Sequence, residues 1–172
     1  MKKRNGSAST RSKMPIAYEV LACTNTALRR AARRLGNLYD DALAPTGLKA
    51  TQLGLLSEIQ RWATANGAQV PTLQDLAGKL AIQISALTHA LRPLVRDGLV
   101  VLQPDEQDGR TKRAALTTAG EARLGEALEH WATVNQRVEA VLGSDSAATL
   151  RALADLVASD EFLASYSDSQ AE

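Results

Sequence analysis

Apolar residues recur at helical spacing along most of the chain, and one stretch carries a strongly polar opposite face. Residues 84–96 place apolar side chains on one side of a helix and polar side chains on the other. The apolar side holds Ile84, Leu87, Leu91, Leu94 and Val95, and the polar side holds Ser85, His89, Arg92 and Arg96. Pro93 predicts a bend and not a stop, and Gly98 predicts the end of the helix. We expect this helix to pack with one side and to expose the other.

A short hairpin is predicted directly after this helix. Leu99–Leu102 form an apolar run, residues 104–110 form a polar tip with an Asp-Gly turn signal, and Lys112–Leu116 return as the second strand. A polar-faced helix followed by a hairpin with a basic edge predicts a winged helix-turn-helix. Such a helix can lie in the major groove of DNA, while the hairpin tip reaches the minor groove or the backbone.

Helical patterns continue on both sides of this unit. The fold class is therefore mainly α with a small β-hairpin wing. Before the wing the pattern predicts helices over 16–44, over 51–64 with Thr51 as the cap, and over 73–80 with Thr72 as the cap. After the wing it predicts a helix capped by Thr117 or Thr118 and another capped by Ser144 or Asp145.

The outer helices carry more apolar surface than a small winged helix can cover. The stripe of the fifth helix is Leu124, Leu128, Trp131, Val134, Val138 and Val141, and that of the sixth is Leu150, Leu153, Leu156 and Val157. Burial against a second copy predicts a two-fold homodimer. The predicted organisation has three parts: a disordered basic arm (1–15), one domain (16–163) and a frayed tail (164–172). Within the domain, dimerisation helices (16–45 and 118–163) lie on both sides of the winged helix-turn-helix (51–116).

Composition narrows the class of protein. Apolar residues make up 45% of the 172 and aromatic residues 3%, and the formal net charge is +1. A single cysteine excludes an internal disulfide and indicates a reducing compartment. Apolar runs are short, so we expect a soluble cytoplasmic protein without a membrane span. No phosphate loop, metal-ligand cluster or nucleophile motif appears, so we expect neither an enzyme nor a cofactor.

Several motifs occur here in the order typical of one family. They are Leu91-Arg92-Pro93-Leu94, Asp97-Gly98-Leu99-Val100, the wing Asp105–Arg110, and Leu116-Thr117-Thr118-Ala119-Gly120. With these motifs the chain resembles the MarR family of bacterial transcriptional regulators over roughly residues 17–163. The family wing reads Asp-x-Arg-Asp-x-Arg, and Gln107 replaces its inner arginine here. The resemblance implies a homodimeric repressor of a pseudo-palindromic double-stranded DNA operator, relieved by a small ligand or by thiol oxidation.

The predicted DNA contacts come from the polar helix face and the wing. Arg92 can offer a fork to guanine, Ser85 and His89 can bond bases or phosphates, and Ala86 and Thr88 can meet thymine methyl groups. Arg110 suits a narrow minor groove, while Lys112 and Arg113 suit phosphates. Asp105 and Asp108 are expected to brace Arg110 or the turn. The alternatives are a merely solvated face, or a winged helix that contacts only proteins.

Five residues are candidates for sensing an effector. Cys23 is either a redox sensor in the first helix, activated by Tyr18 or Tyr39, or a small buried core residue. Trp62, His130 and Trp131 are candidates to line a pocket for a small aromatic effector, and each is otherwise a structural residue. A run of four arginines in the first helix is interpreted as a solvated helix face, and the alternative is that some of them contact the DNA backbone or a ligand carboxylate: Arg29, Arg30, Arg33 and Arg34.

Overall fold

The computed structural model of the chain describes residues 23–169. Residues up to Arg34 form one unit and residues from Leu35 a second, and each is described by itself. The mainly helical architecture with one antiparallel hairpin, in the part described, confirms the predicted fold class. The elements are α1 (Thr24–Leu43), the 3-10 turn η2 (Ala44–Thr46), α2 (Ala50–Ala65), α3 (Leu73–Lys79), α4 (Ile84–Arg96), β1 (Val100–Pro104), β2 (Lys112–Leu116), α5 (Thr118–Leu142), α6 (Ser144–Val157) and α7 (Asp160–Asp168).

The described part of the first unit runs from Cys23 to Arg34. The backbone N–H of Ala27 donates to the carbonyl of Cys23 over 3.0 Å and begins α1. The predicted helix start at Ile16, the basic arm and Tyr18 lie outside the described residues. All four arginines of this segment are exposed, which agrees both with a solvated face and with an outside contact: Arg29, Arg30, Arg33 and Arg34.

A local capping box begins α3, as the sequence predicts. Thr72 is the N-cap, and its hydroxyl oxygen accepts from the backbone N–H of Asp75 over 3.0 Å. The Asp75 carboxylate accepts in return from the backbone N–H of Thr72 over 2.9 Å. These two bonds satisfy N–H groups that the first turn of a helix leaves unpaired. The start of the helix-turn-helix is therefore set by two residues three positions apart.

The start of α2 differs from the prediction, because Lys49 and not Thr51 is the N-cap. The side-chain oxygen of Gln52 accepts from the backbone N–H of Lys49 over 2.9 Å. The Asp40 carboxylate, on α1, accepts from the backbone N–H of Ala50 over 2.7 Å. A carboxylate ten residues away thus supplies the cap, so Thr51 has no capping role.

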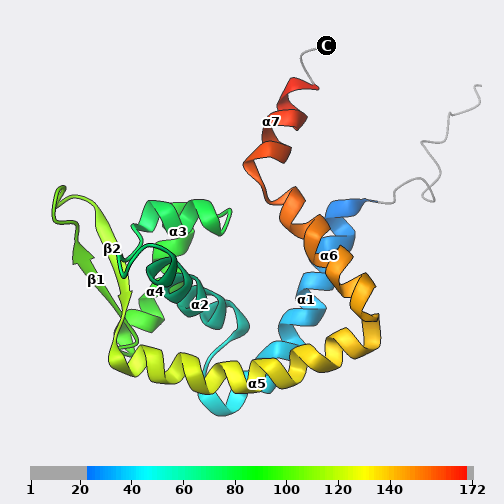
Figure 1. The fold of residues 1–172 in the computed structure, drawn as a ribbon, viewed down its shortest axis with the longest axis horizontal. Helices are drawn as coiled ribbons and strands as arrows, with labels where there is room; N and C mark the ends of the chain where they lie inside the picture. The colour runs from blue at the N-terminus through cyan, green and yellow to red at the C-terminus, as the bar shows by residue number, and fades with distance from the viewer. Residues whose placement is uncertain (1–22, 170–172) are drawn as a thin grey trace, which may run out of the picture. The chain divides into compact units, whose positions relative to one another are not determined.

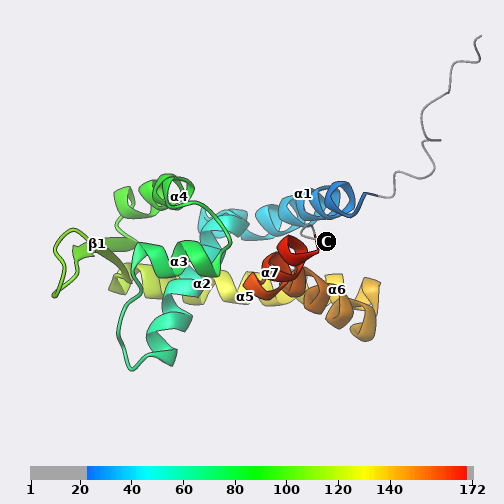
Figure 2. The same cartoon turned by 90° about the horizontal axis from the view of Figure 1, so that it is seen from above.

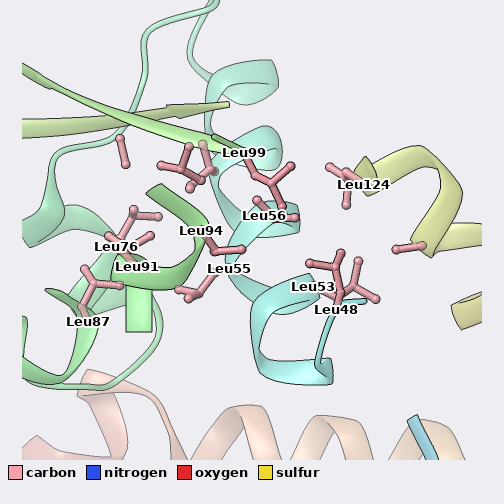
Figure 3. Packing of buried hydrophobic residues seen from close by; sticks show 14 of the residues in the cluster. Leu48, Leu53, Leu55, Leu56, Leu76, Leu87, Leu91, Leu94, Leu99 and Leu124 are labelled. Carbon is pink, nitrogen blue, oxygen red and sulfur yellow. The ribbon is translucent and has the colours of Figure 1, made fainter. Parts of the chain in front are cut away.

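Leucine side chains from α2, α3 and α4 form the core of the helix-turn-helix (Figure 3). Leu87, Leu91 and Leu94 are fully buried and fix one side of α4 against it. Two predicted members of that side, Ile84 and Val95, are 45% and 37% exposed instead. They lie at the margins of the stripe, near the two ends of α4. The helix continues past Pro93 to Arg96, as predicted.

The hairpin is an antiparallel ladder beside α2, α3 and α4 (Figure 1). Its register pairs Val100 with Leu116 at the base and Pro104 with Lys112 near the tip. The backbone N–H of Ala114 also donates to the carbonyl of Pro71 over 3.0 Å, which attaches β2 to the segment before α3. From above, the tip projects beyond these helices (Figure 2).

The helices after the wing begin at side-chain or glycine caps. Thr117 caps α5 by accepting from the backbone N–H of Gly120 over 3.0 Å, so the first of its two predicted caps is confirmed. Gly143 is the N-cap of α6, where the sequence predicts Ser144 or Asp145. Ser159 caps α7 by accepting from the backbone N–H of Phe162. The sequence analysis did not predict this helix, and residues 164–168 of it belong to the tail predicted to be frayed.

The predicted apolar stripes of α5 and α6 are largely uncovered in the single chain. Leu124 is buried, but Leu128 and Trp131 are exposed and Val141 is 88% exposed. The four α6 positions are all exposed as well: Leu150, Leu153, Leu156 and Val157. None of the helices that the structure describes is long and apolar enough to cross a membrane.

The first turn of α5 lies directly on the start of the hairpin. A Cβ atom at Gly120 would stand 2.0 Å from the carbonyl oxygen of Leu99, far inside contact distance. The same carbonyl accepts the backbone N–H of Thr117 over 3.1 Å, so it is held in place. Only glycine permits this approach of the helix to the backbone.

We expect Gly120→Ala to destabilise the fold by about 1–3 kcal/mol, because the backbone must move to accept the methyl group. Gly125→Ala is the matched control, since a Cβ there meets nothing within 4 Å. The control should be neutral or stabilise the helix by up to about 1 kcal/mol. Urea unfolding of both variants measures the difference, and equal stability would contradict the close approach.

Candidate nucleic-acid interface

The outward face of α4 carries the residues that the sequence singles out. Ser85, Ala86, His89 and Arg92 are exposed, and Thr88 is half-buried. The Thr88 hydroxyl donates to the carbonyl of Ile84 over 2.8 Å, so its methyl group is the part left for an outside contact. Gln83, and not Ser85, is the N-cap of α4, so Ser85 is not occupied as a cap.

Two arginines on α4 differ in what they already bind. Arg96 donates from Nε and from an Nη atom to the Asp97 carboxylate over 2.8 and 3.3 Å. This hydrogen bond, together with the charge of Arg96, lowers the pKa of Asp97. Within the described residues no side-chain bond or ion pair engages Arg92. Arg92 therefore keeps all its donors for an outside partner.

A groove next to this face includes residues that the sequence reasoning missed. It has a volume of about 510 Å³ and lies between the start of α2 and the outer side of α4. Lys49, Thr51 and Gln52 line it from α2, and His89 and Arg92 line it from α4. The sequence does show polar side chains at the start of this helix, namely Lys49, Thr51 and Gln52. The prediction that Thr51 caps the helix left no role for them in binding.

The two wing aspartates brace the turn, as expected. Asp105 accepts from the backbone N–H groups of Gln107 and Asp108, each over 2.9 Å. Asp108 accepts from the backbone N–H of Arg110 and from the Thr111 hydroxyl, each over 3.0 Å. Both carboxylates are thus directed at the hairpin itself. The side chain of Arg110 remains exposed at the tip.

Arg113 has a different environment from its neighbour Lys112. The sequence predicts both as phosphate contacts, and Lys112 is exposed. The Arg113 side chain is 21% exposed, and its Nε donates to the Asp105 carboxylate. Its Nη1 donates to the carbonyl of Val70 over 2.5 Å. The bond from Arg113, with the two backbone N–H groups of the turn, lowers the pKa of Asp105. The carboxylate therefore stays charged, and the pair intact, until the pH falls below the usual range of an aspartate.

A separate pocket of about 540 Å³ is bounded by α2, α5 and Tyr39. Of the three residues predicted to line such a pocket, Trp131 lines it, while the half-buried Trp62 and His130 do not. Tyr39, which the sequence suggested only as an activator of Cys23, lines it as well. The Tyr39 hydroxyl donates to the side-chain oxygen of Asn135 over 2.8 Å. Burial raises the pKa of Tyr39, and the charge of Glu139 adds to the effect. The other polar lining residues are Ser57, Gln60 and Arg61.

Cys23 is exposed in the first unit and is not the buried residue of the core alternative. The side-chain hydrogen bond with Thr26 lowers the pKa of its thiol, and backbone bonds with Thr26 and Asn25 act in the same direction. Among residues 23–169 no group of histidine, cysteine or carboxylate side chains could hold a metal ion.

Comparison with known proteins gives several relatives of the same kind. The transcriptional regulator MosR of M. tuberculosis, solved in complex with DNA, is 36% identical, with a TM-score of 0.67 over 78% of this chain and 92% of that one. A MarR mutant of E. coli, complexed with operator DNA, is 26% identical, with a TM-score of 0.67 over 77% and 91%. No protein-family model matches the chain.

A curated relative extends the comparison beyond solved structures. The transcriptional activatory protein BadR of Rhodopseudomonas palustris is 32% identical over 93 residues, which are 54% of this chain. The match spans about half the length of that relative. Two observations agree. The hairpin lies beside an exposed polar helix, and the similarity to MosR extends over nearly the whole MosR chain. This chain belongs to the MarR family of winged helix-turn-helix transcriptional regulators.

Proposed function

We propose that the chain is a sequence-specific double-stranded DNA-binding regulator that represses transcription as a homodimer. The observation that carries this proposal is the unengaged Arg92 on the exposed face of α4, beside a braced wing that presents Arg110. The DNA complexes of MosR and MarR support it by similarity.

The helix α4 supplies the base contacts in this proposal. A guanidinium offers two parallel donors to O6 and N7 of guanine, which is the commonest specific contact in the major groove. Ser85 and His89 lie on the same exposed face and can bond bases or phosphates. Ala86 and the methyl group of Thr88 suit a thymine methyl. The α2 residues of the neighbouring groove, Lys49 among them, suit the phosphate backbone.

The wing supplies contacts beside the major groove. Its exposed Arg110 suits a narrow minor groove, where the negative potential is concentrated. Lys112, at the end of β2 nearest the tip, suits a phosphate. Because Asp105 and Asp108 are used by the turn, their charges do not point at the approaching strand.

A second copy covers the exposed apolar stripes of α5 and α6 in this proposal. The uncovered leucines and valines of those helices form surface that water does not favour. Two copies related by a two-fold axis place their α4 helices one DNA turn apart, about 34–36 Å. The operator is then a pseudo-palindrome.

A small aromatic effector in the pocket beside Tyr39 relieves repression in this proposal. The cavity has a size usual for ligand sites, and Trp131 offers a ring to stack on. The effector acts by favouring a conformation in which the two α4 helices are wrongly spaced for DNA. The alternative relief, oxidation of Cys23, has the lowered pKa of that thiol in its favour.

Selection of bound fragments from a random DNA pool tests DNA recognition, and we expect a pseudo-palindrome. On that site Arg92→Ala should weaken binding by about 1–3 kcal/mol and relax the preference at one base pair. Arg92→Lys keeps the charge but loses the fork, so it should retain the salt dependence and lose the preference. Arg137→Ala, an exposed α5 arginine, is the control for charge. If no sequence is selected at any salt concentration, the winged helix contacts proteins instead.

The dimer is tested on α6. Leu153→Glu should convert the protein to a monomer in analytical ultracentrifugation and lower operator affinity by about a hundredfold, since the two half-sites are no longer linked. Ala148→Glu adds the same charge on the opposite side of α6 and should change neither property. A dimer that survives Leu153→Glu would place the interface elsewhere.

The two routes of relief are separated at Cys23. If the effector acts through the pocket, Cys23→Ser should bind the operator like the wild type and respond equally to an inducing ligand. Mild peroxide should then change operator binding by less than about twofold, since the chain holds no second cysteine with which Cys23 could form an internal disulfide. A peroxide effect that is present in the wild type and absent from Cys23→Ser would instead assign the sensor to the thiol.

A further inference from the structure

One side chain connects the wing to the segment that leads into the helix-turn-helix. Arg113 donates from Nε to the Asp105 carboxylate at the wing and from Nη1 to the carbonyl of Val70. Val70 lies two residues before Thr72, the cap of α3. Arg113 also forms a backbone bridge with Thr72. The guanidinium therefore joins two segments that are 35 residues apart in sequence.

The connection continues to the wing tip through carboxylates. The Asp105 side chain is only 11% exposed, and its second oxygen accepts from the backbone of Gln107 and Asp108. Asp108 in turn accepts from the backbone N–H of Arg110. A chain of hydrogen bonds thus runs from Val70 through Arg113 to the residue proposed to enter the minor groove.

The space beneath this connection is hollow and polar. A cavity of about 420 Å³ lies between the wing and the segment before α3, and its lining includes Gln69, Gln103 and Gln107. Apolar packing is therefore not what sets the angle of the wing at this point. The hydrogen bonds from Arg113 to Asp105 and Val70 are then what restrains the wing. A planar guanidinium suits this role because its several donors point in fixed directions.

We propose that Arg113 is a positioning residue that sets the placement of Arg110 relative to α4, and not a phosphate contact. This inference rests on the proposed function, because the placement matters only for a wing that meets DNA. It predicts that charge alone at position 113 is insufficient. A lysine there keeps the charge but does not reproduce two donors directed at Asp105 and Val70.

The first test compares charge with geometry on the selected operator. Arg113→Lys should lower affinity about three- to tenfold and leave the slope of log K against log salt unchanged. A phosphate contact would give the opposite pattern, with affinity retained by lysine and a slope smaller by about one in Arg113→Met. That opposite pattern would overturn the proposal.

The second test asks whether position 113 acts through Arg110. In the wild type Arg110→Ala should weaken binding about tenfold, whereas in the Arg113→Met background it should cost less than about twofold. Independent losses that simply add would overturn the proposal. A merely structural role of Arg113 would lower the unfolding midpoint and leave the two losses additive.

A matched pair at the wing tip separates the restraint from charge. Asp105→Asn and Glu106→Gln each remove one negative charge from the wing, and only Asp105 binds Arg113. We expect Asp105→Asn to lower operator affinity although it makes the wing more positive, while Glu106→Gln leaves affinity equal or slightly higher. Equal behaviour of the two variants would contradict the restraint.

Hydrogen exchange of the free protein distinguishes failure of this inference from failure of the proposed function. Amides of residues 105–112 should exchange several-fold faster in Arg113→Lys and Asp105→Asn than in the wild type or Glu106→Gln. If that difference appears and no DNA is selected, the restraint is real and the proposed function is wrong. If DNA is selected and exchange is unchanged, the inference on Arg113 is wrong.

Discussion

Burial of three leucines on one side of α4 is the constraint on which the rest of the interface depends. Leu87, Leu91 and Leu94 are fully buried against α2 and α3, so rotation of α4 about its axis would expose them to water. Burying one leucine side chain is worth about 1.5–3 kcal/mol, and three together exceed any single polar contact on the surface. The outward direction of His89 and Arg92 therefore follows from packing on the other side of the helix.

Arginines in this fold divide into those with partners and those without. Arg96 binds Asp97, Arg61 binds the buried Glu58, and Arg113 binds Asp105, whereas no described contact engages Arg92 or Arg110 by its side chain. An arginine already paired with a carboxylate contributes less to a positive surface and loses freedom to meet an outside group. Which guanidinium groups are left to meet an outside partner thus depends on contacts made only in the folded chain, and sequence position alone does not reveal them.

The sequence predicted the elements whose causes are local. The Thr72 cap and the turn at Asp105–Arg110 each depend on side chains within a few residues of the backbone groups they satisfy. The cap of α2 was not predicted, because the first N–H group of the helix, that of Ala50, is bound by the carboxylate of Asp40, ten residues away. The restraint at Arg113 was missed for the same reason, since Val70 and Asp105 come together only in the fold. Of the residues predicted to line a pocket only Trp131 lines the cavity beside Tyr39, because helical spacing does not tell which side of α5 faces α2.

A formal net charge of +1 is small for a protein that binds a polyanion such as DNA. The structure explains how so small a net charge is compatible with DNA binding. Four carboxylates near the interface bind backbone N–H groups or arginines inside the fold: Asp40, Asp97, Asp105 and Asp108. Asp40 stabilises the start of α2, Asp105 and Asp108 stabilise the wing turn, and Asp97 neutralises Arg96 at the end of α4. Within the described residues no ion pair engages the exposed Arg92, Arg110 or Lys112, and the field of such charges extends only about 8–10 Å in physiological salt. Affinity for a phosphate backbone depends on that local arrangement and not on the sum over the chain.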